Sequence, residues 1–288
     1  MSDVTSISRA RGGYSKSGLL LRHGLLIAFG FLMLYPLLWM LKSSFTFEGE
    51  IFSGFGLIPA GATLDNYVRG WMISDFPLYL VNTIIVVVGC LVGNLIACAL
   101  AAYAFARLQF RMRRPFFVLM LAGIMLPYHV VAVPQYIMFS AVDLVGDSFL
   151  PLIIPKLLAT DAFFIFLMIQ FLRGIPRELD AAAAIDGAGH YRTFWSIILP
   201  LMRPALLTTA IFTFIWTWND FFSPLIYLTN PNSYTISLGL NALLDSETAT
   251  GYGPLFAMSV LTLVPVFLFF LFAQKQLVQG IATTGTKG

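Results

Sequence analysis

The stretch GLLIAFGFLMLYPLLWML, residues 24–41, decides the fold class of this chain. It carries no charged side chain over about 18 residues, which at about 1.5 Å of rise per residue span roughly 27 Å of bilayer. Only helices and closed barrels satisfy every backbone N–H and C=O across such a length of lipid, and a run this long fits a helix. The sequence therefore predicts a transmembrane helix here. The run is too long for the apolar part of a signal peptide, so we expect an uncleaved first helix.

Similar apolar runs recur along the rest of the chain. Hydrophobic residues make up 58% of the 288 residues and charged residues 11%, whereas a soluble domain has about 25% charged residues. We expect an all-α membrane protein with six transmembrane helices, a transmembrane domain over 24–288 and a core at about 75–276. The five further runs lie at about 78–106, 115–138, 148–172, 205–228 and 255–274.

Basic residues mark one side of the membrane. Most of the 17 Lys and Arg residues lie before the first run, after the second, after the fourth and after the sixth. The opposite loops hold only Lys42 and Arg69 among mostly acidic side chains. By the positive-inside rule, both termini are predicted to be cytoplasmic, with residues 1–23 as a cytoplasmic tail.

The cytoplasmic loop 173–203 is much longer than a helical hairpin needs. Pro176 and the acidic Glu178 indicate a helix start, and residues 181–184 are alanines, which are strong helix formers. Asp186-Gly187 indicates the end of this helix, because glycine adopts a left-handed conformation without a steric penalty. A second helix follows, with an apolar stripe at three- and four-residue spacing: Tyr191, Phe194, Trp195 and Ile198.

The loop is thus predicted to be a helix–glycine–helix elbow that projects from the membrane. The alternative is an interfacial helix that rests on lipid headgroups. The alanine-rich arm offers little apolar area to lipid, whereas small side chains allow close packing against another protein.

The elbow also carries a family resemblance. Its sequence IPRELDAAAAIDGA, residues 175–188, followed by Phe194 and by Leu199-Pro200, closely resembles the EAA loop of ABC-transporter permeases. Those permeases are the membrane subunits of importers that use an external binding protein. One position departs from the pattern, because Ala181 stands where the family usually has the glutamate that gives the loop its name. Further stretches resemble the sugar-importer branch with MalG-like subunits: 63–67, 101–107, 218–221 with 224–225, and 274–280 with 287–288.

The resemblance, which covers roughly 60–288, implies a type I importer permease with the elbow between helices 4 and 5. It also implies residence in a bacterial inner membrane, surrounded by lipid, and import of a sugar, polyol or glycoside by ATP-driven alternating access. The implied partners are a second homologous permease subunit, two ATPase subunits and an extracytoplasmic solute-binding protein, with no nucleic acid. ATP and Mg²⁺ are expected in the ATPase subunits and no cofactor in this chain, which lacks a G-x-x-x-x-G-K-[ST] phosphate loop. We therefore expect no enzymatic activity and no metal site.

In such permeases the elbow sits in a groove of the ATPase and transmits its closure to the helices. The residues that the resemblance implies for this coupling are Glu178, Asp180, Ala182, Ala183, Asp186, Gly187, Ala188 and Phe194.

Two ionisable residues, Lys156 and Asp161, fall inside the fourth apolar run, where charge is costly and usually faces a cavity or a partner. Five residues apart on one continuous helix, they would pair only loosely. Our hypothesis is that Asp161 lines the substrate path and accepts hydrogen bonds from sugar hydroxyls, with stacking from Trp216 or Trp218. The alternative is a polar contact between helices or subunits, and it applies equally to Asn219 and Asp220. The candidate substrate-path residues are Asp161, Trp218, Asn219 and Asp220.

Three other functional classes are alternatives for a membrane protein of this kind. An ion-driven secondary transporter would need paired intramembrane carboxylates and often an internal repeat, whereas the sequence has one mid-helix aspartate and no clear repeat. An intramembrane enzyme would need a nucleophile–base pair, and none is visible. A receptor or scaffold is not excluded by the elbow itself.

Overall fold

The computed structural model describes residues 16–59, 61–245 and 251–285, and its regular structure is helical. Four segments are long and apolar enough to span a membrane: α1 (Lys16–Ser44), α3 (Phe76–Arg107), α6 with α7 (Leu150–Leu157 and Ala162–Arg173), and α15 (Tyr252–Gly285). The chain is therefore an all-α membrane protein, as predicted.

The remaining two expected spans are not straight. α4 (Arg113–Ile124) and α5 (Tyr128–Ser140) meet at an angle of 106°, so the run at 115–138 is a bent pair. Pro127 explains this break, because it lacks an N–H group and its extended backbone (ψ 133°) leaves the helical path. The fifth run is also interrupted: α11 (Arg203–Trp218) ends early, and α12 (Phe222–Tyr227) is a separate short helix.

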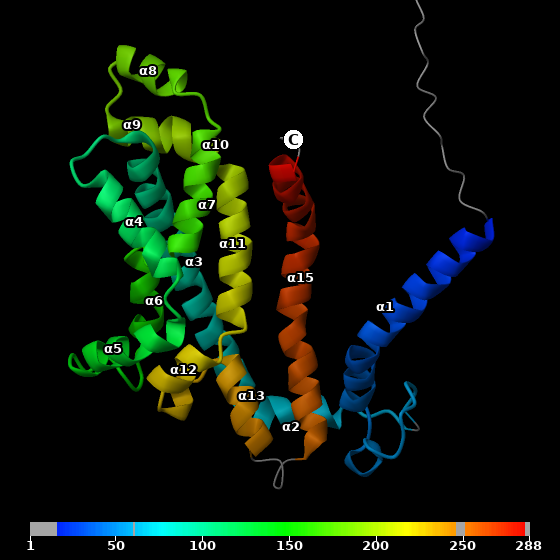
Figure 1. Cartoon of the computed structure of the whole chain (residues 1–288). Coiled ribbons are helices and arrows are strands. Elements are labelled where there is room, and N and C mark those ends of the chain that lie inside the picture. The colour runs from blue at the N-terminus through cyan, green and yellow to red at the C-terminus, as the bar shows by residue number, and fades with distance from the viewer. Residues whose placement is uncertain (1–15, 60, 246–250, 286–288) are drawn as a thin grey trace, which may run out of the picture.

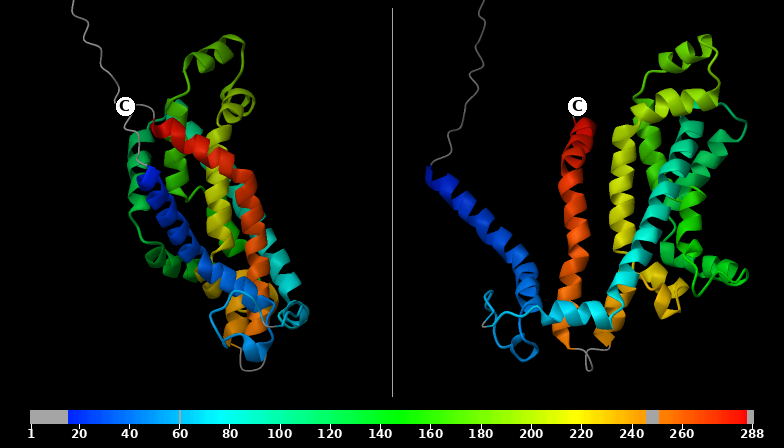
Figure 2. Two further views of the ribbon diagram at one scale, coloured as in Figure 1. Left: turned by 90° about the vertical axis from the view of Figure 1, so that its right-hand side faces the viewer. Right: turned by 180° about the vertical axis from the view of Figure 1, so that it is seen from behind.

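Short elements close the end of the bundle opposite the elbow (Figure 1 and Figure 2). α2 lies across this end, and α13 follows beside it. The short elements between the spans are η1 (Glu48–Glu50), α2 (Asp65–Ile73), η3 (Pro231–Ser233) and α13 (Ile236–Asp245). One isolated β-bridge joins Gly146 to Leu228.

α3 is the central helix, and it packs against α6, α7 and α11. Gly89 and Gly93, four residues apart, face α6 and let the two helices approach closely. A Cβ atom at Gly93 would lie 3.1 Å from the backbone nitrogen of Leu157, and one at Gly89 would lie 2.6 Å from the Ile153 side chain. This small-residue pair therefore sets the spacing between α3 and α6.

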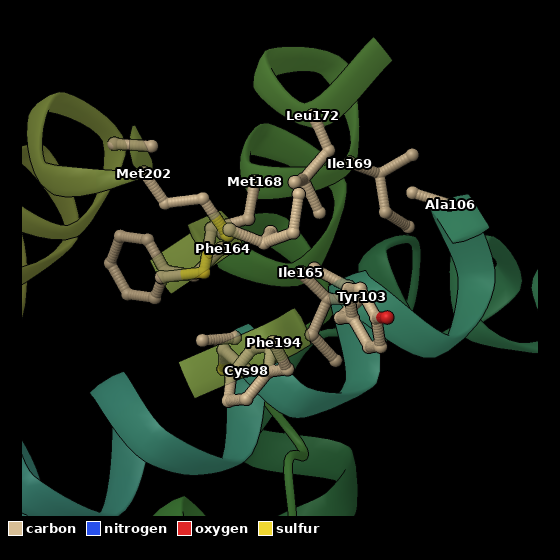
Figure 3. Packing of buried hydrophobic residues seen from close by; sticks show 14 residues of the cluster. Cys98, Tyr103, Ala106, Phe164, Ile165, Met168, Ile169, Leu172, Phe194 and Met202 are labelled. Atoms are coloured by element: carbon tan, nitrogen blue, oxygen red, sulfur yellow. The ribbon is translucent and has the colours of Figure 1, made fainter. Parts of the chain in front are cut away.

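The largest buried cluster joins α3, α7 and the elbow. Figure 3 shows Phe164, Met168 and Leu172 of α7 in one cluster with Tyr103 and Ala106 of α3. Because dispersion and burial depend on close contact, this cluster fixes the elbow end of the bundle as one packed unit.

α1 leans away from the other helices (Figure 1), and its apolar window has no buried residue. Residues 16–23 already belong to this helix, so it begins before the apolar run that starts at Gly24. The first turns of α1, the end of α15 and the elbow all lie at the same end of the molecule (Figure 2). Residues 1–15 of the expected tail lie outside the described residues.

Candidate functional site: an elbow and an intramembrane cavity

The first arm of the elbow is α8 (Glu178–Ile185), which begins and ends where the sequence predicts. The Ala188 N–H donates to the Ala183 carbonyl at 2.8 Å, and the Gly187 N–H donates to the Ala184 carbonyl at 3.1 Å. These two bonds form the Schellman pattern that ends a helix with a left-handed residue. Gly187 is that residue, with a φ of +74°.

The outer surface of the elbow is apolar and uncovered within this chain. Ile185 is 87% exposed and Tyr191 is 76% exposed. Ala182 is exposed as well, whereas Ala183 is buried. Glu178 and Asp186 are exposed at the two ends of α8. Exposed large apolar side chains beyond the membrane spans are typical of a surface that another protein covers.

The second arm consists of α9 (His190–Thr193), a π-helical turn (Phe194–Ile198) and α10 (Leu199–Leu201). The predicted single stripe is wrong, because its four residues occupy two adjacent faces. Tyr191 and Trp195 are exposed, whereas Phe194 and Ile198 are buried in the bundle. The Phe194 and Tyr103 rings lie 5.1 Å apart. Phe194 therefore anchors the elbow to α3 instead of facing outward.

The last turn of α3 contacts the first arm through two arginines, Arg107 of α3 and Arg177 of the elbow. Arg107 Nε lies 3.3 Å from Asp180 Oδ2, and an Arg107 guanidinium N–H donates to the Ile175 carbonyl at 2.8 Å. Arg177 reaches back and donates to the Ala106 carbonyl at 3.2 Å. The Arg107 side chain is only 6% exposed. Asp180, one of the expected coupling residues, is thus paired inside the chain.

A cavity of about 370 Å³ lies between α3, α4, α5, α6, α7, α11 and α12. Polar groups and aromatic rings line it together, which suits a polar molecule with apolar faces. Its polar lining includes Tyr128, Gln135, Lys156, Thr160, Asp161, Asp220 and Ser223, and its aromatic lining includes Phe163, Phe164 and Trp216.

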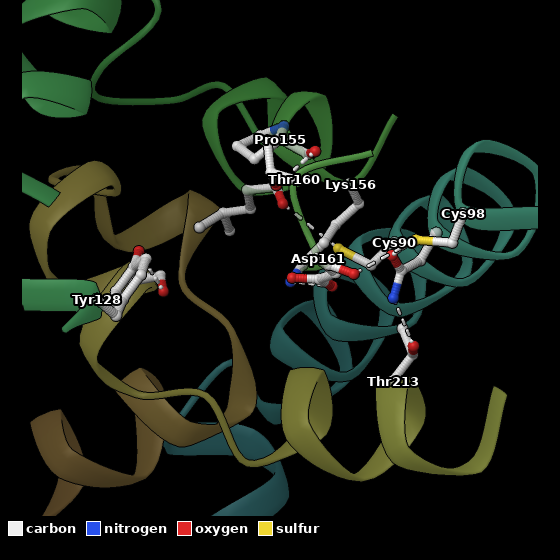
Figure 4. A network of polar contacts seen from close by, with 11 residues as sticks. Cys90, Cys98, Tyr128, Pro155, Lys156, Thr160, Asp161 and Thr213 are labelled. Carbon is white, nitrogen blue, oxygen red and sulfur yellow. Dashed lines mark hydrogen bonds and ion pairs between the residues drawn. The ribbon is translucent and has the colours of Figure 1, made fainter. Parts of the chain in front are cut away.

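An ion pair crosses the break between α6 and α7. Lys156 Nζ lies 2.8 Å from Asp161 Oδ2 and donates to Oδ1 at 3.1 Å (Figure 4). The expected loose pairing is therefore wrong, because the two residues are not on one continuous helix. The chain turns at Ala159, with a φ of +56°, and this turn brings Asp161 back over Lys156.

Asp220 lines the same cavity. Its Oδ1 accepts a hydrogen bond at 3.1 Å from the N–H of Ser223, in the first turn of α12. Ser223 Oγ in turn lies 3.0 Å from the Tyr128 hydroxyl oxygen. Two of the four candidate substrate-path residues, Asp161 and Asp220, therefore meet at one cavity.

The other two candidates lie outside the cavity lining. Trp218 is 4% exposed and stacks on Phe214 at 5.5 Å, within a separate buried cluster. Asn219 is exposed, and its side-chain amide donates to the Ile215 carbonyl at 2.7 Å. The hypothesis for Trp216 fits better, because its ring lines the cavity. Sequence reasoning missed Tyr128 and Gln135, although both are polar interruptions of an apolar run.

The cavity offers hydrogen-bond donors and acceptors with little nucleophilic chemistry. Among the described residues, no group of three or more His, Cys, Asp or Glu side chains is placed to hold a metal. Cys90 and Cys98 are buried and unpaired by disulfide; Cys98 Sγ donates to Asn94 Oδ1 at 3.0 Å. The arrangement suits binding and passage of a polar solute.

Comparisons with known proteins agree with this architecture. Residues 93–282 match the family described as "Binding-protein-dependent transport system inner membrane component". The chain is 32% identical to the diacetylchitobiose uptake system permease protein NgcG of Streptomyces coelicolor, over 97% of this chain and 92% of that protein. It is 33% identical to the trehalose/maltose transport system permease protein MalG of Thermococcus litoralis, over 91% and 94% of the two chains.

A solved structure shares the fold. A chain of a bacterial ABC transporter that imports the acidic polysaccharide alginate superposes with a TM-score of 0.80, at 23% identity, over 91% of this chain and 98% of that one. Together the matches define a membrane permease subunit. The chain belongs to the family of binding-protein-dependent transport system inner membrane components.

Proposed function

We propose that this chain is one permease subunit of an ATP-driven importer for a sugar or a related polyol or glycoside. The observation that carries the proposal is the combination of an apolar elbow surface with a polar, aromatic cavity in one helical bundle. Similar permeases for diacetylchitobiose and for trehalose and maltose support the sugar class. Among the described residues nothing favours the ion-driven alternative, and Lys156, inside the fourth apolar run, is already paired with Asp161.

The cavity would form this subunit's wall of the substrate path. Sugar hydroxyls suit the carboxylates of Asp161 and Asp220 and the Tyr128 hydroxyl, and a sugar ring face suits the partly exposed indole of Trp216. A second homologous permease subunit would complete the path. We place one copy of this chain with that subunit and with two ATPase subunits, which would hold ATP and Mg²⁺.

The elbow would dock into the ATPase and move with it. Ile185, Tyr191 and Ala182 would supply the contact surface, and Gly187 the rigid turn. Glu178, Asp186 and Ala188 lie at the ends of α8 and would orient it in the groove. Under this proposal the elbow and both termini face the cytoplasm, in accordance with the excess of basic residues at that end.

The decisive experiment is transport by the reconstituted importer. The chain would be purified with its partner permease and ATPase and placed in proteoliposomes with a binding protein loaded with a radiolabelled oligosaccharide. The expected result is uptake that requires ATP and persists when a protonophore abolishes the proton gradient. Uptake by this chain alone, driven by an ion gradient, would refute the proposal.

Orientation needs its own measurement. Cys90 and Cys98 are buried, so a cysteine introduced at the exposed Ser196 of the elbow would dominate labelling. A membrane-impermeant maleimide should label Ser196→Cys only in inside-out vesicles. Labelling in intact, right-side-out vesicles would invert the proposed topology.

A further inference from the structure

The last turns of α3 hold both arms of the elbow. Arg107 binds the first arm through Asp180 and the Ile175 carbonyl. Tyr103, one turn earlier, donates to the His190 carbonyl at 3.3 Å, where the second arm begins. Each arm is therefore attached to α3 by a side chain, in addition to its covalent links to α7 and α11.

Arg107 Nε and Asp180 Oδ2 form an ion pair by their 3.3 Å separation, without a hydrogen bond between the two atoms. The Arg107 guanidinium is nearly buried, so solvent and salt screen the pair less than they screen a surface ion pair. One planar guanidinium makes both contacts, to a carboxylate and to a carbonyl, and a lysine ammonium would not reproduce this fork. The return bond from Arg177 to the Ala106 carbonyl closes the contact from the other side.

α3 connects this contact to the cavity without a break. Its 32 residues rise about 48 Å as one helix. Thr83, Val86 and Cys90 of α3 line the cavity, and Cys90 Sγ donates to the Leu152 carbonyl of α6 at 3.4 Å. At its far end, Asn82 donates to the carbonyls of Asn232 and Tyr234. A displacement of one end of α3 therefore reaches the cavity wall directly.

We propose that Arg107 is a positioning residue that couples the elbow to α3, so that elbow movement is transmitted to the cavity through the Arg107–Asp180 ion pair. This inference rests on the proposed function of the elbow as the ATPase-docking element. It assigns to Asp180 a contact within the chain, where the family resemblance suggests a contact with the ATPase. The route through α3 is separate from the covalent routes through α7 and α11.

The test uses the assembled importer in proteoliposomes and three variants: Arg107→Gln, Asp180→Asn, and the charge swap Arg107→Asp with Asp180→Arg. Arg192→Gln, an exposed arginine on the same elbow, is the matched control. Readouts are ATPase co-purification, the number of ATP molecules hydrolysed per sugar imported, and the distance between spin labels at the exposed Gln109 and at the exposed Ala184 of the first arm.

The expected result is a loss of coupling without a loss of assembly. In Arg107→Gln and Asp180→Asn, the ATPase should co-purify and hydrolyse ATP, while transport per ATP falls about fivefold or more, the lower range of typical coupling between sites. On ATP binding, the distribution of distances between the spin labels should broaden in these two variants. It should stay narrow in the wild type and in the Arg192→Gln control. The charge swap should recover much of the transport.

Each other outcome is decisive. The coupling role of Arg107 is overturned if both single variants import as much sugar per ATP hydrolysed as the wild type. It is also overturned if the distribution of spin-label distances stays narrow in both variants. A charge swap that recovers assembly without coupling also overturns it. If Arg107→Gln fails to assemble, Asp180→Asn decides, because it retains the bond from Arg107 to Ile175. Failure of the wild-type chain to bind the ATPase would instead refute the proposed function.

Discussion

Lys156 and Asp161 form a two-point contact across a helix break, with Nζ at 2.8 and 3.1 Å from the two carboxylate oxygens. Both side chains are partly exposed to the cavity, at 28% and 23%. The pair therefore has a structural role, which is to hold α6 against α7, and a position from which Asp161 can also contact a solute. A single substitution separates these roles only when stability and transport are measured together.

Loss of one partner should destabilise the transporter. We expect Lys156→Met or Asp161→Asn to cost about 2 kcal/mol, below the roughly 3–5 kcal/mol of fully buried pairs because the cavity solvates the remaining charge. The measurement is thermal unfolding of the purified complex in detergent. The double variant Lys156→Met with Asp161→Asn should cost less than the two single variants combined, and additive losses would contradict a direct interaction.

Transport by the same variants tests the substrate-path hypothesis. If Asp161 contacts the sugar, the double variant should transport with a raised KM even when its stability is near that of the wild type. Trp216→Ala, in the lining of the same cavity, should raise KM as well, whereas Trp218→Ala should lower stability without a selective effect on KM. Unchanged kinetics and substrate range in Asp161→Ala would leave Asp161 only its structural role.

The sequence predicts the fold class well because lipid imposes a strong rule. Backbone N–H and C=O groups in lipid must form hydrogen bonds within the protein, so an apolar run such as residues 24–41 is expected to form a helix. The elbow is equally predictable, since alanines followed by Asp186-Gly187 encode a helix and its stop locally. Both features depend on residues close together in the chain.

The cavity is less predictable because it depends on where helices break. Hydropathy predicts residues 115–138 and 205–228 as spans. It does not detect a bend, because the run at 115–138 has the same hydropathy whether it is straight or turns through 106°. The break at Ala159 likewise decides whether Lys156 and Asp161 meet, and no turn residue such as glycine marks it. Trp216 and Trp218 differ by about 200° around α11, so only the packing of that helix selects which ring lines the cavity.

Gly187 should tolerate few residues despite open space around it. A Cβ atom there meets no heavy atom within 4 Å, so the cost of Gly187→Val is the strain of a β-branched residue at a φ of +74°. We expect normal membrane insertion with loss of ATPase co-purification or coupling. Gly187→Asn, which accepts this conformation more readily, should be milder, and Gly189→Val, at a φ of −72°, should be nearly neutral. Equal behaviour of all three variants would contradict a rigid turn at Gly187.

The spacing of α3 and α6 should be sensitive to added volume at Gly93. Gly93→Val places a branched side chain against the Leu157 backbone, which cannot rotate away as the Ile153 side chain opposite Gly89 can. We expect a destabilisation of about 1–3 kcal/mol, typical of overpacking, measured as a lower unfolding temperature. Gly123→Val on α4, where a Cβ meets open space, is the control. A control as unstable as Gly93→Val would indicate a general intolerance of valine and not a close α3–α6 contact.

The elbow offers a direct contrast between a buried and an exposed apolar residue. Phe194 is 2% exposed and packs on Tyr103, so Phe194→Ala should cost about 3–5 kcal/mol of stability, as large core truncations do. Ile185 is 87% exposed, so Ile185→Ser should leave the unfolding temperature of the isolated chain unchanged. Its effect should appear only with the ATPase present, as weaker co-purification and slower sugar-stimulated ATP hydrolysis. Full ATPase binding by Ile185→Ser and by Tyr191→Ser together would mean that a different surface of this chain docks the ATPase, since these are the two most exposed large apolar side chains of the elbow.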